Sequence, residues 1–411
     1  MAFRNKIRFV WLPAVVLLAV TLTASTSPAS FEDEFRKGLL ALQNNQLTEA
    51  RECLLRASRL EPGNARVWVA LAQAYLRNKD KGHATGAALH AETIAANDPV
   101  IQHALAIFFS ETGDLRKAAD LERRYAGSKS ADSYAAARAA TFSLQAGEPQ
   151  QAITWARAAL GKGESAEMHH LLGIAEEAAG QPDVALTDLR KAVDLAPYDE
   201  DLTFDLGQAL LRRRDFAAAL TFLSQARERF SKSAQIEVAY GIAAYGHRQF
   251  RDAITAFLHA TELDPSLAES YICIGRIVEN VDDLMPQVLS RFSAWVAAEP
   301  GNYLPWFLHA KALDSSSRDF ATSETELRRS ISLNPNFWES RLELGIVLVE
   351  LGRWQEALPE LNRAIALDPS KAKPHFQLAR VYRHLGRTED ARQELAEFQK
   401  LSVSETGSLL P

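Results

Sequence analysis

The sequence predicts an all-α protein, an α-solenoid built from about eleven helix–turn–helix units of 34 residues. Three observations support this prediction. Similar phrases recur along the chain with a period close to 34 residues. Each phrase contains two runs of apolar residues at helical spacing, and many of them end at a proline. Self-similarity at this period is the signature of helical repeat architectures, in which neighbouring units share a core.

One alanine position shows the period. The stretch "LGRWQEALPELNRAIALDP" (351–369) has parallels at 247–265, 179–197 and 44–62. A chance pattern would not keep its phase at intervals of 33 to 35 residues over eleven units. The residues aligned at this position are Ala50, Ala84, Ala118, Ala152, Ala185, Ala219, Ala253, Val288, Ser323, Ala357 and Ala391. Prolines that close units keep the same interval: Pro62, Pro197, Pro265, Pro300, Pro335 and Pro369.

Each unit is expected to form two helices. In the unit at 338–371, Gly352 ends the first helical pattern, and Pro369 ends the second because the residue before a proline disfavours the α region. Pro359 sits inside that second helix, where it should remove a hydrogen bond. Three other prolines fall where second helices begin, a position that tolerates proline: Pro149, Pro182 and Pro286.

A small residue recurs in the first helix of the unit. We expect it to face the aligned alanine of the second helix, as Gly207 would face Ala219, because helices approach to about 8 Å only where the contact residues are small. A larger side chain at either position should push the helices apart. The small residues are Gly38, Ala72, Ala106, Ala140, Gly173, Gly207, Gly241, Gly275, Gly345 and Ala379.

This pattern resembles the tetratricopeptide repeat (TPR) family, which shows Trp, Leu-Gly, Tyr, Ala, Phe, Ala and Pro in order within its unit. The resemblance implies a right-handed superhelix whose first helices line a concave face, and a function in binding proteins or peptides. The matching residues are Trp68, Leu71 and Tyr75 in one unit, Leu172, Gly173, Ala185, Ala192 and Pro197 in another, and Tyr240, Gly241, Ala253, Phe257, Ala260 and Pro265 in a third.

The resemblance covers 31–405, where eleven units fit without remainder. Two regions depart from the pattern. The segment "YAGSKSADS" (125–133) lacks a closing proline and suggests a loosened joint, and the units within 268–337 carry extra residues, which are either ordinary divergence or a functional insertion. The polar stretch 402–411 is expected to be disordered, and the tail that follows the last unit is placed at 406–411. The units lie near 31–64, 65–98, 99–132, 133–165, 166–199, 200–233, 234–267, 268–302, 303–337, 338–371 and 372–405.

The N-terminus, 1–29, is expected to be an export signal peptide. A basic start precedes the apolar run "FVWLPAVVLLAVTLTA" (9–24) and the small residues "STSPAS". Sixteen apolar residues form about 24 Å of helix, less than the ~30 Å hydrocarbon core of a membrane. We therefore expect cleavage and an extracytoplasmic location, periplasmic or secreted, with no membrane span after cleavage. An uncleaved membrane anchor is the alternative.

Composition excludes some classes of function. The net charge of −6 does not suit a nucleic-acid binder, which needs a basic face. Cys53 and Cys273 are 220 residues apart and fall in distant units of a linear stack, so two separate core cysteines are expected rather than a disulfide or a metal site.

No catalytic constellation is recognisable, so we expect no enzyme activity, no cofactor and no metal. The repeats leave no room for a separate catalytic domain, and GxSxG, HExxH and CxxC are absent. "EMHHLLGIAEEA" (167–178) is the one cluster worth weighing. Its pairs His169 with Glu176 and His170 with Glu177 are seven residues apart, too far along a helix to share one ion.

By the resemblance, certain positions of the first helices point into the concave groove. Two interpretations of these mostly apolar residues stay open: they form a trough for an extended or helical peptide, or they simply pack between neighbouring units. The candidate partner-binding residues are Phe35, Val69, His103, Tyr134, His170, Phe204, Val238, Ile242, Ile272, Arg276, Leu342, Phe376 and Arg380.

The sequence therefore predicts an exported, non-enzymatic scaffold or assembly factor of the cell envelope that binds a partner protein or peptide in its groove. One alternative is a solenoid that binds carbohydrate or a cell-wall polymer through groove aromatics. Another is an enzyme with an unrecognised site around His169, His170, Glu176 and Glu177. Self-association is also open, because the last unit ends with Leu395 and Phe398 and has no evident polar capping helix.

Overall fold

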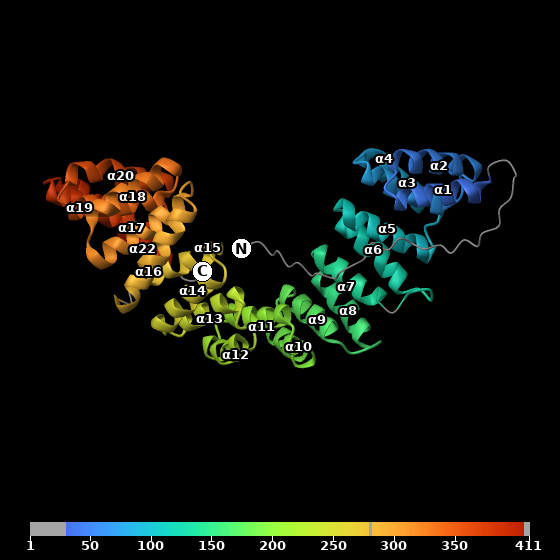
Figure 1. Cartoon of the computed structure of the whole chain (residues 1–411), viewed down its shortest axis with the longest axis horizontal. Coiled ribbons are helices and arrows are strands. Elements are labelled where there is room, and N and C mark those ends of the chain that lie inside the picture. Colours follow the sequence, from blue (N-terminus) through green and yellow to red (C-terminus); the bar gives the residue numbers. More distant parts are fainter. Residues whose placement is uncertain (1–29, 133, 279–281, 407–411) are drawn as a thin grey trace. The chain divides into compact units, whose positions relative to one another are not determined.

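The computed structural model describes residues 30–132, 134–278 and 282–406. This part of the chain is all-α and contains no strand. Its 22 α-helices follow one another as a first and a second helix joined by a short turn, the first helices being odd-numbered (Figure 1). These pairs confirm the predicted α-solenoid, whereas the number and the bounds of the repeat units stay predictions. Among these helices none is long and apolar enough to cross a membrane, and the expected signal peptide lies outside the described residues.

The chain divides into two compact units, which we describe separately. The first, Met1–Pro197, contains α1 (Phe31–Gln43), α2 (Leu47–Leu60), α3 (Ala65–Arg77), α4 (Lys81–Ile94), α5 (Pro99–Thr112), α6 (Leu115–Ala126), α7 (Ala135–Gln145), α8 (Pro149–Leu160), α9 (Ala166–Ala178) and α10 (Pro182–Leu195). Its core packs apolar side chains of α1 to α6 into one cluster and those of α7 to α9 into another.

The second unit, Tyr198–Pro411, contains α11 (Glu200–Arg212), α12 (Phe216–Arg229), α13 (Ala234–Gly246), α14 (Phe250–Leu263), α15 (Ala268–Ile277), the 3₁₀ helix η2 (Asp282–Leu284), α16 (Met285–Ala298), α17 (Tyr303–Ser317), α18 (Phe320–Leu333), α19 (Trp338–Glu350), α20 (Trp354–Leu367), α21 (Ala372–His384) and α22 (Thr388–Thr406). One core cluster runs from α13 to α21.

Local sequence explains where these helices begin and end. Pro149, Pro182 and Pro286 lie in the first turns of α8, α10 and α16, as expected, and Pro359 lies inside α20. Ten of the described turns between a first and a second helix contain a residue in the left-handed region of φ. Five are glycines, among them Gly352, which ends α19 as expected, and the others are Asn45, Lys79, Arg214, Arg248 and Arg318.

These left-handed turns give a paired prediction about stability. Lys79→Gly is expected to raise the free energy of unfolding by roughly 1 kcal/mol, because a side chain with a Cβ is strained at a φ of 61°. Gly352→Ala, at a φ of 74°, should lower it by about as much. Urea unfolding of both variants would check the signs, and a shift of the two midpoints in the same direction would contradict the explanation.

The closing prolines join each helix pair to the next. In several units a side chain of the following first helix donates a hydrogen bond to the carbonyl oxygen of the proline six residues before it. Proline lacks an N–H but keeps this acceptor, so the turn stays tied to the next pair. The donors are Trp68 Nε1 to Pro62 (2.9 Å), Tyr271 Oη to Pro265 (3.2 Å), Trp306 Nε1 to Pro300 (3.1 Å) and Arg341 Nε to Pro335 (3.2 Å).

The close contact inside each pair differs in detail from the prediction. The aligned alanines are buried, but a Cβ built on Gly207 would lie 2.7 Å from Leu223, one turn after Ala219. Gly241 meets Phe257 in the same way, at 2.5 Å. A helical side chain leans toward the N-terminus of its helix and covers the preceding turn, which explains the offset. The glycine therefore receives a large side chain, and the alanine leaves room for it.

The segment expected to be a loosened joint is held by polar contacts. Tyr125 Oη donates to the backbone oxygen of Ser130 and lies 3.2 Å from Asp132 Oδ2. The backbone N–H of Asp132 donates back to Tyr125 Oη (3.2 Å), and Arg138 Nη2 donates to Asp132 Oδ2 (2.6 Å). Hydrogen bonds thus replace the missing proline in the described part of this turn.

The irregular units within 268–337 differ in backbone packing. The backbones of α15 and α16 approach less closely than those of most other pairs, and the stacked rings of Tyr271 and Trp295, 4.1 Å apart, lie between them. The space beside Gly275 is taken by Leu308 of α17, and Lys311 Nζ donates to the Gly275 carbonyl oxygen (2.8 Å). Lys311 thus satisfies a carbonyl near the end of α15, a ten-residue helix.

The C-terminal helix extends slightly further than the sequence indicates. Residues 402–406, which belong to the polar stretch read as disordered, continue α22 to Thr406. Ser402 Oγ donates to the Phe398 carbonyl oxygen (2.6 Å) within this last part. The rest of the expected tail, 407–411, lies outside the described residues.

Candidate functional site

The predicted groove residues differ widely in exposure. Tyr134 is 64% exposed, Phe376 is 39% exposed, and Arg276 is exposed as well. Tyr134 is the N-cap residue of α7 and the second residue of its unit, 133–165. The fifth place, which Phe35 and Phe376 hold in their units, belongs here to the buried Ala137. The ring of Phe376 lies 5.2 Å from that of Phe398 on α22. These three candidates are accessible to a partner.

Six candidates are half-buried: His103, His170, Phe204, Ile242, Ile272 and Arg380. Arg380 Nη2 donates to Glu350 Oε1 (3.2 Å), and its Nη1 donates to Gln377 Oε1 (2.8 Å). His103 Nδ1 lies 2.8 Å from Glu122 Oε2. The polar groups of these two candidates are therefore already engaged within the chain, and their remaining surface is what a partner would contact.

Four candidates are buried: Phe35, Val69, Val238 and Leu342. Phe35 stacks on Phe31 with ring centroids 5.4 Å apart, and Val238 and Leu342 belong to the core cluster of the second unit. For these four the geometry favours packing, one of the two interpretations left open by the sequence. They are accessible to a partner only if the helices around them move.

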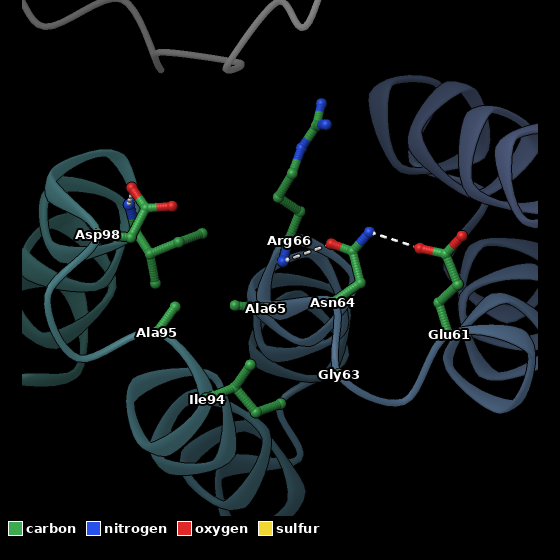
Figure 2. A pocket seen from close by; sticks show the side chains of 9 residues that line it. Glu61, Gly63, Asn64, Ala65, Arg66, Ile94, Ala95 and Asp98 are labelled. Carbon is green, nitrogen blue, oxygen red and sulfur yellow. Dashed lines mark hydrogen bonds between the residues drawn. The ribbon is translucent and has the colours of Figure 1, made fainter.

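A pocket of about 550 Å³ lies at the turns before α3 and α5 (Figure 2). Its apolar lining includes Ala65, Ile94 and Ile101. Figure 2 shows the carboxylates of Glu61 and Asp98 on opposite sides, while the side chain of Arg66 extends away from the others. None of the candidate groove residues lines this pocket. Both polar and apolar residues line this hollow, and all of them belong to the first unit.

The carboxylates of this pocket have partners within their own turns. Asn64 Nδ2 donates to Glu61 Oε2 (2.9 Å), and the backbone N–H of Val100 donates to Asp98 Oδ1 (2.9 Å). Asp98 is the N-cap of α5, and Asn64 caps α3 by accepting from the backbone N–H of Arg66 (3.2 Å). Capping explains these residues without a ligand.

A buried ionic cluster connects α5, α6 and α7. Glu122 on α6 is fully buried, with Oε1 2.7 Å from Arg138 Nε and Oε2 2.8 Å from His103 Nδ1. Arg138 also reaches Asp132. Burial alone would raise the pKa of Asp132, but the hydrogen bond and charge of Arg138 outweigh it and hold that pKa below its usual value.

The sequence analysis did not identify this cluster. The available signal was Arg138 itself, a lone charge inside the run "YAAARAATF" (134–142), which otherwise holds small, apolar or hydroxyl residues. A buried charge requires a partner, but its partners lie 16 and 6 residues away and depend on the tertiary packing. Each member has a partner within the cluster, which is typical of a structural role.

The histidine cluster of α9 does not assemble a metal site. His169 Nδ1 lies 2.7 Å from Asp188 Oδ1, and its Nε2 lies 3.0 Å from Glu164 Oε1, so the two carboxylates contact opposite sides of the ring. Among the described residues no group of three or more His, Cys, Asp or Glu side chains is arranged to hold a metal ion.

Both cysteines are free thiols, Cys53 buried and Cys273 half-buried. Burial raises the pKa of Cys53, and it raises the pKa of Cys273 to about 11. Because the thiolate is the nucleophile, we expect both to react slowly with iodoacetamide at pH 8 in the folded protein and rapidly in urea. Mass spectrometry of single-cysteine variants would check this, and rapid native labelling of Cys273→Ala, which retains Cys53, would contradict the burial of that thiol.

The last helix pair ends in charged side chains. Arg380 and Arg383 take the places that Ile346 and Val349 hold one unit earlier. Val349 is 2% exposed because α21 packs against α19, whereas Arg383 is exposed. Charges at these positions disfavour the stacking of a further helix pair.

Comparisons with known proteins found only distant likenesses among solved structures. No curated protein matches the chain. Among solved structures, yeast Tom70 is 15% identical, and the match covers 90% of this chain and 92% of the Tom70 chain, with a TM-score of 0.40. The APC/C hetero-tetramer Cut9–Hcn1 is 12% identical over 91% of this chain and 94% of its own (TM-score 0.42). YrrB, described as a TPR protein with an unusual peptide-binding site, is 20% identical over 44% of this chain and 95% of its own (TM-score 0.36).

Two family models described as tetratricopeptide repeat match the sequence itself. One matches residues 177–244 and 348–399, and the other matches 35–100 and 309–372. Together they cover more than half of the chain and fall in both compact units. The helix pairs, their left-handed turns and their buried small residues account for these matches in physical terms. The chain belongs to the tetratricopeptide repeat family.

Proposed function

We propose that this chain is an exported, non-enzymatic scaffold or assembly factor of the cell envelope that binds a protein or peptide partner along the first helices of its repeats. Membership of the TPR family, whose members bind peptides and proteins, carries the proposal. The N-terminal apolar run of 9–24 supports export. No catalytic constellation is recognisable in the sequence, and this supports a binding role.

The accessible candidates suggest how a partner is held. Tyr134 and Phe376 expose aromatic surface in the first and second compact unit respectively. Exposed aromatic side chains supply large contact area at low conformational cost, and interfaces are enriched in them. A partner segment with apolar anchor residues is the occupant that such side chains fit best.

An affinity pull-down from envelope extract tests the proposal. Tyr134→Glu and Phe376→Glu place a charge on the candidate surface and should abolish or strongly reduce recovery of a partner that the wild type captures. Matched controls are Leu89→Glu on the second helix α4, and Leu351→Glu in the turn after α19, which has the same 39% exposure as Phe376. Equal losses in all four variants would contradict binding along the first helices.

A further inference from the structure

Glu176 is a fully buried carboxyl group with one unsatisfied oxygen. It lies on α9 and is 0% exposed. Its Oε1 accepts a hydrogen bond from Arg157 Nη2 of α8 (3.0 Å). Its Oε2 is buried and has no hydrogen-bond donor within reach. Burying a charged carboxylate oxygen without a donor is strongly unfavourable, and protonation of the carboxyl group removes most of that penalty.

A second carboxyl group lies beside it. Asp188 of α10 is close enough to Glu176 for both charge repulsion and a hydrogen bond between the two carboxyls. Asp188 Oδ1 is 2.7 Å from His169 Nδ1. On the far side of that imidazole, Glu164 of the turn before α9 lies 3.0 Å from His169 Nε2 and 3.6 Å from Lys191 Nζ of α10. Two carboxylates cannot hydrogen-bond to each other unless a proton lies between them.

We infer that Glu176 is a neutral carboxylic acid at neutral pH, that its Oε2–H donates to Asp188, and that this proton makes the packing of α8, α9 and α10 sensitive to pH. The proton satisfies Oε2 and removes the repulsion of the two carboxyls. Arg157 keeps its hydrogen bond to Oε1, and His169 keeps its contact with Asp188. Arg157 of α8 and Asp188 of α10 face Glu176, whereas His169 contacts Asp188 and Glu164 contacts the far side of the His169 ring.

The electrostatics agree with this geometry. Burial is the largest cause and raises the pKa of Glu176, the hydrogen bond from Arg157 lowers it, and Asp188 raises it further, so that it lies above its ordinary value. A group with a raised folded pKa contributes stability that is complete below its unfolded pKa, about 4.3 for glutamate, and is lost as pH rises through the folded pKa. A rise in pH through the folded pKa of Glu176 should therefore loosen these three helices.

The test compares Glu176→Gln with wild type in urea unfolding between pH 5.5 and 8.5. Glutamine mimics the neutral acid, since it accepts from Arg157 and donates to Asp188. We expect a difference in favour of the variant that grows as the pH rises, by up to tenfold in the unfolding equilibrium for each pH unit between the unfolded pKa, about 4.3, and the folded pKa, and that levels off above the folded pKa. Glu167→Gln, an exposed position on the same helix, should show no growing difference.

Two outcomes would overturn the inference. A Glu176→Gln protein that is less stable than wild type by the same amount at every pH would mean that Glu176 is ionised and paired with Arg157. The infrared carbonyl band of a protonated carboxylic acid gives a readout that does not depend on unfolding. We expect this band in wild type at pH 7 and its loss in Glu176→Gln, and identical spectra would contradict the assignment of the proton.

Discussion

Arg138→Met is expected to lower the free energy of unfolding of the first compact unit by about 3–5 kcal/mol. Glu122 is fully buried, and Arg138 Nε, 2.7 Å away, is its charged partner at Oε1. Methionine fills similar space but leaves a buried carboxylate with only His103 beside it. Removing one member of a buried ion pair is far more destabilising than replacing both members with apolar residues of similar size. Urea unfolding followed by circular dichroism measures the change.

Two further variants separate the charge effect from packing. Arg138→Met combined with Glu122→Gln should recover part of the loss, because a neutral amide is less unfavourable to bury than an unpaired carboxylate. Arg392 and Glu389 form an exposed pair, with side chains that are 73% and 74% exposed. Arg392→Met breaks this pair and should leave the free energy of unfolding indistinguishable from that of wild type. If Arg138→Met also behaved like wild type, the buried cluster would not hold α6 and α7 together.

Gly241→Leu is the second large expected effect, a loss of about 3 kcal/mol in the second compact unit. A Cβ at Gly241 would already lie 2.5 Å from the ring of Phe257, which is itself buried, so neither side chain has space to move. Gly86 is the matched control, a helical glycine of α4 with no atom within 4 Å of a built Cβ. Gly86→Leu should stabilise the protein by roughly 1 kcal/mol, because leucine is the better helix former.

Thermal unfolding of the two leucine variants tests the packing of the helix pair. Opposite shifts in the melting temperature are expected. A Gly241→Leu protein at least as stable as wild type would mean that α13 and α14 can separate without loss, and the explanation for the recurring small residues would then be wrong.

Much of the fold follows from local sequence. The interval of the aligned alanines, the first-turn prolines and Gly352 correctly indicate where helices begin and end, because each acts on the backbone of its own turn. The partner of Gly241 could not be read in the same way. It is Phe257 rather than Ala253, since side-chain direction along the second helix decides which residue covers the glycine.

The candidate site is less predictable because it depends on how neighbouring pairs stack. Phe35 and Phe376 occupy the same place in their units, yet one is 2% exposed and the other 39%. Phe35 packs among residues of its own and the next pair, whereas Phe376 lies in the last described pair. The cluster around Glu122 also depends on tertiary packing, since His103, Glu122 and Arg138 come from three different helices and meet only where these helices pack together.

Hydrogen–deuterium exchange with a purified partner from the pull-down tests the central claim most directly. The proposal predicts new protection in first helices, above all at the start of α7 around Tyr134 and in α21 around Phe376. Second helices such as α4 should change little. Protection confined to second helices, with α7 and α21 unchanged, would contradict partner binding along the first helices of this TPR protein.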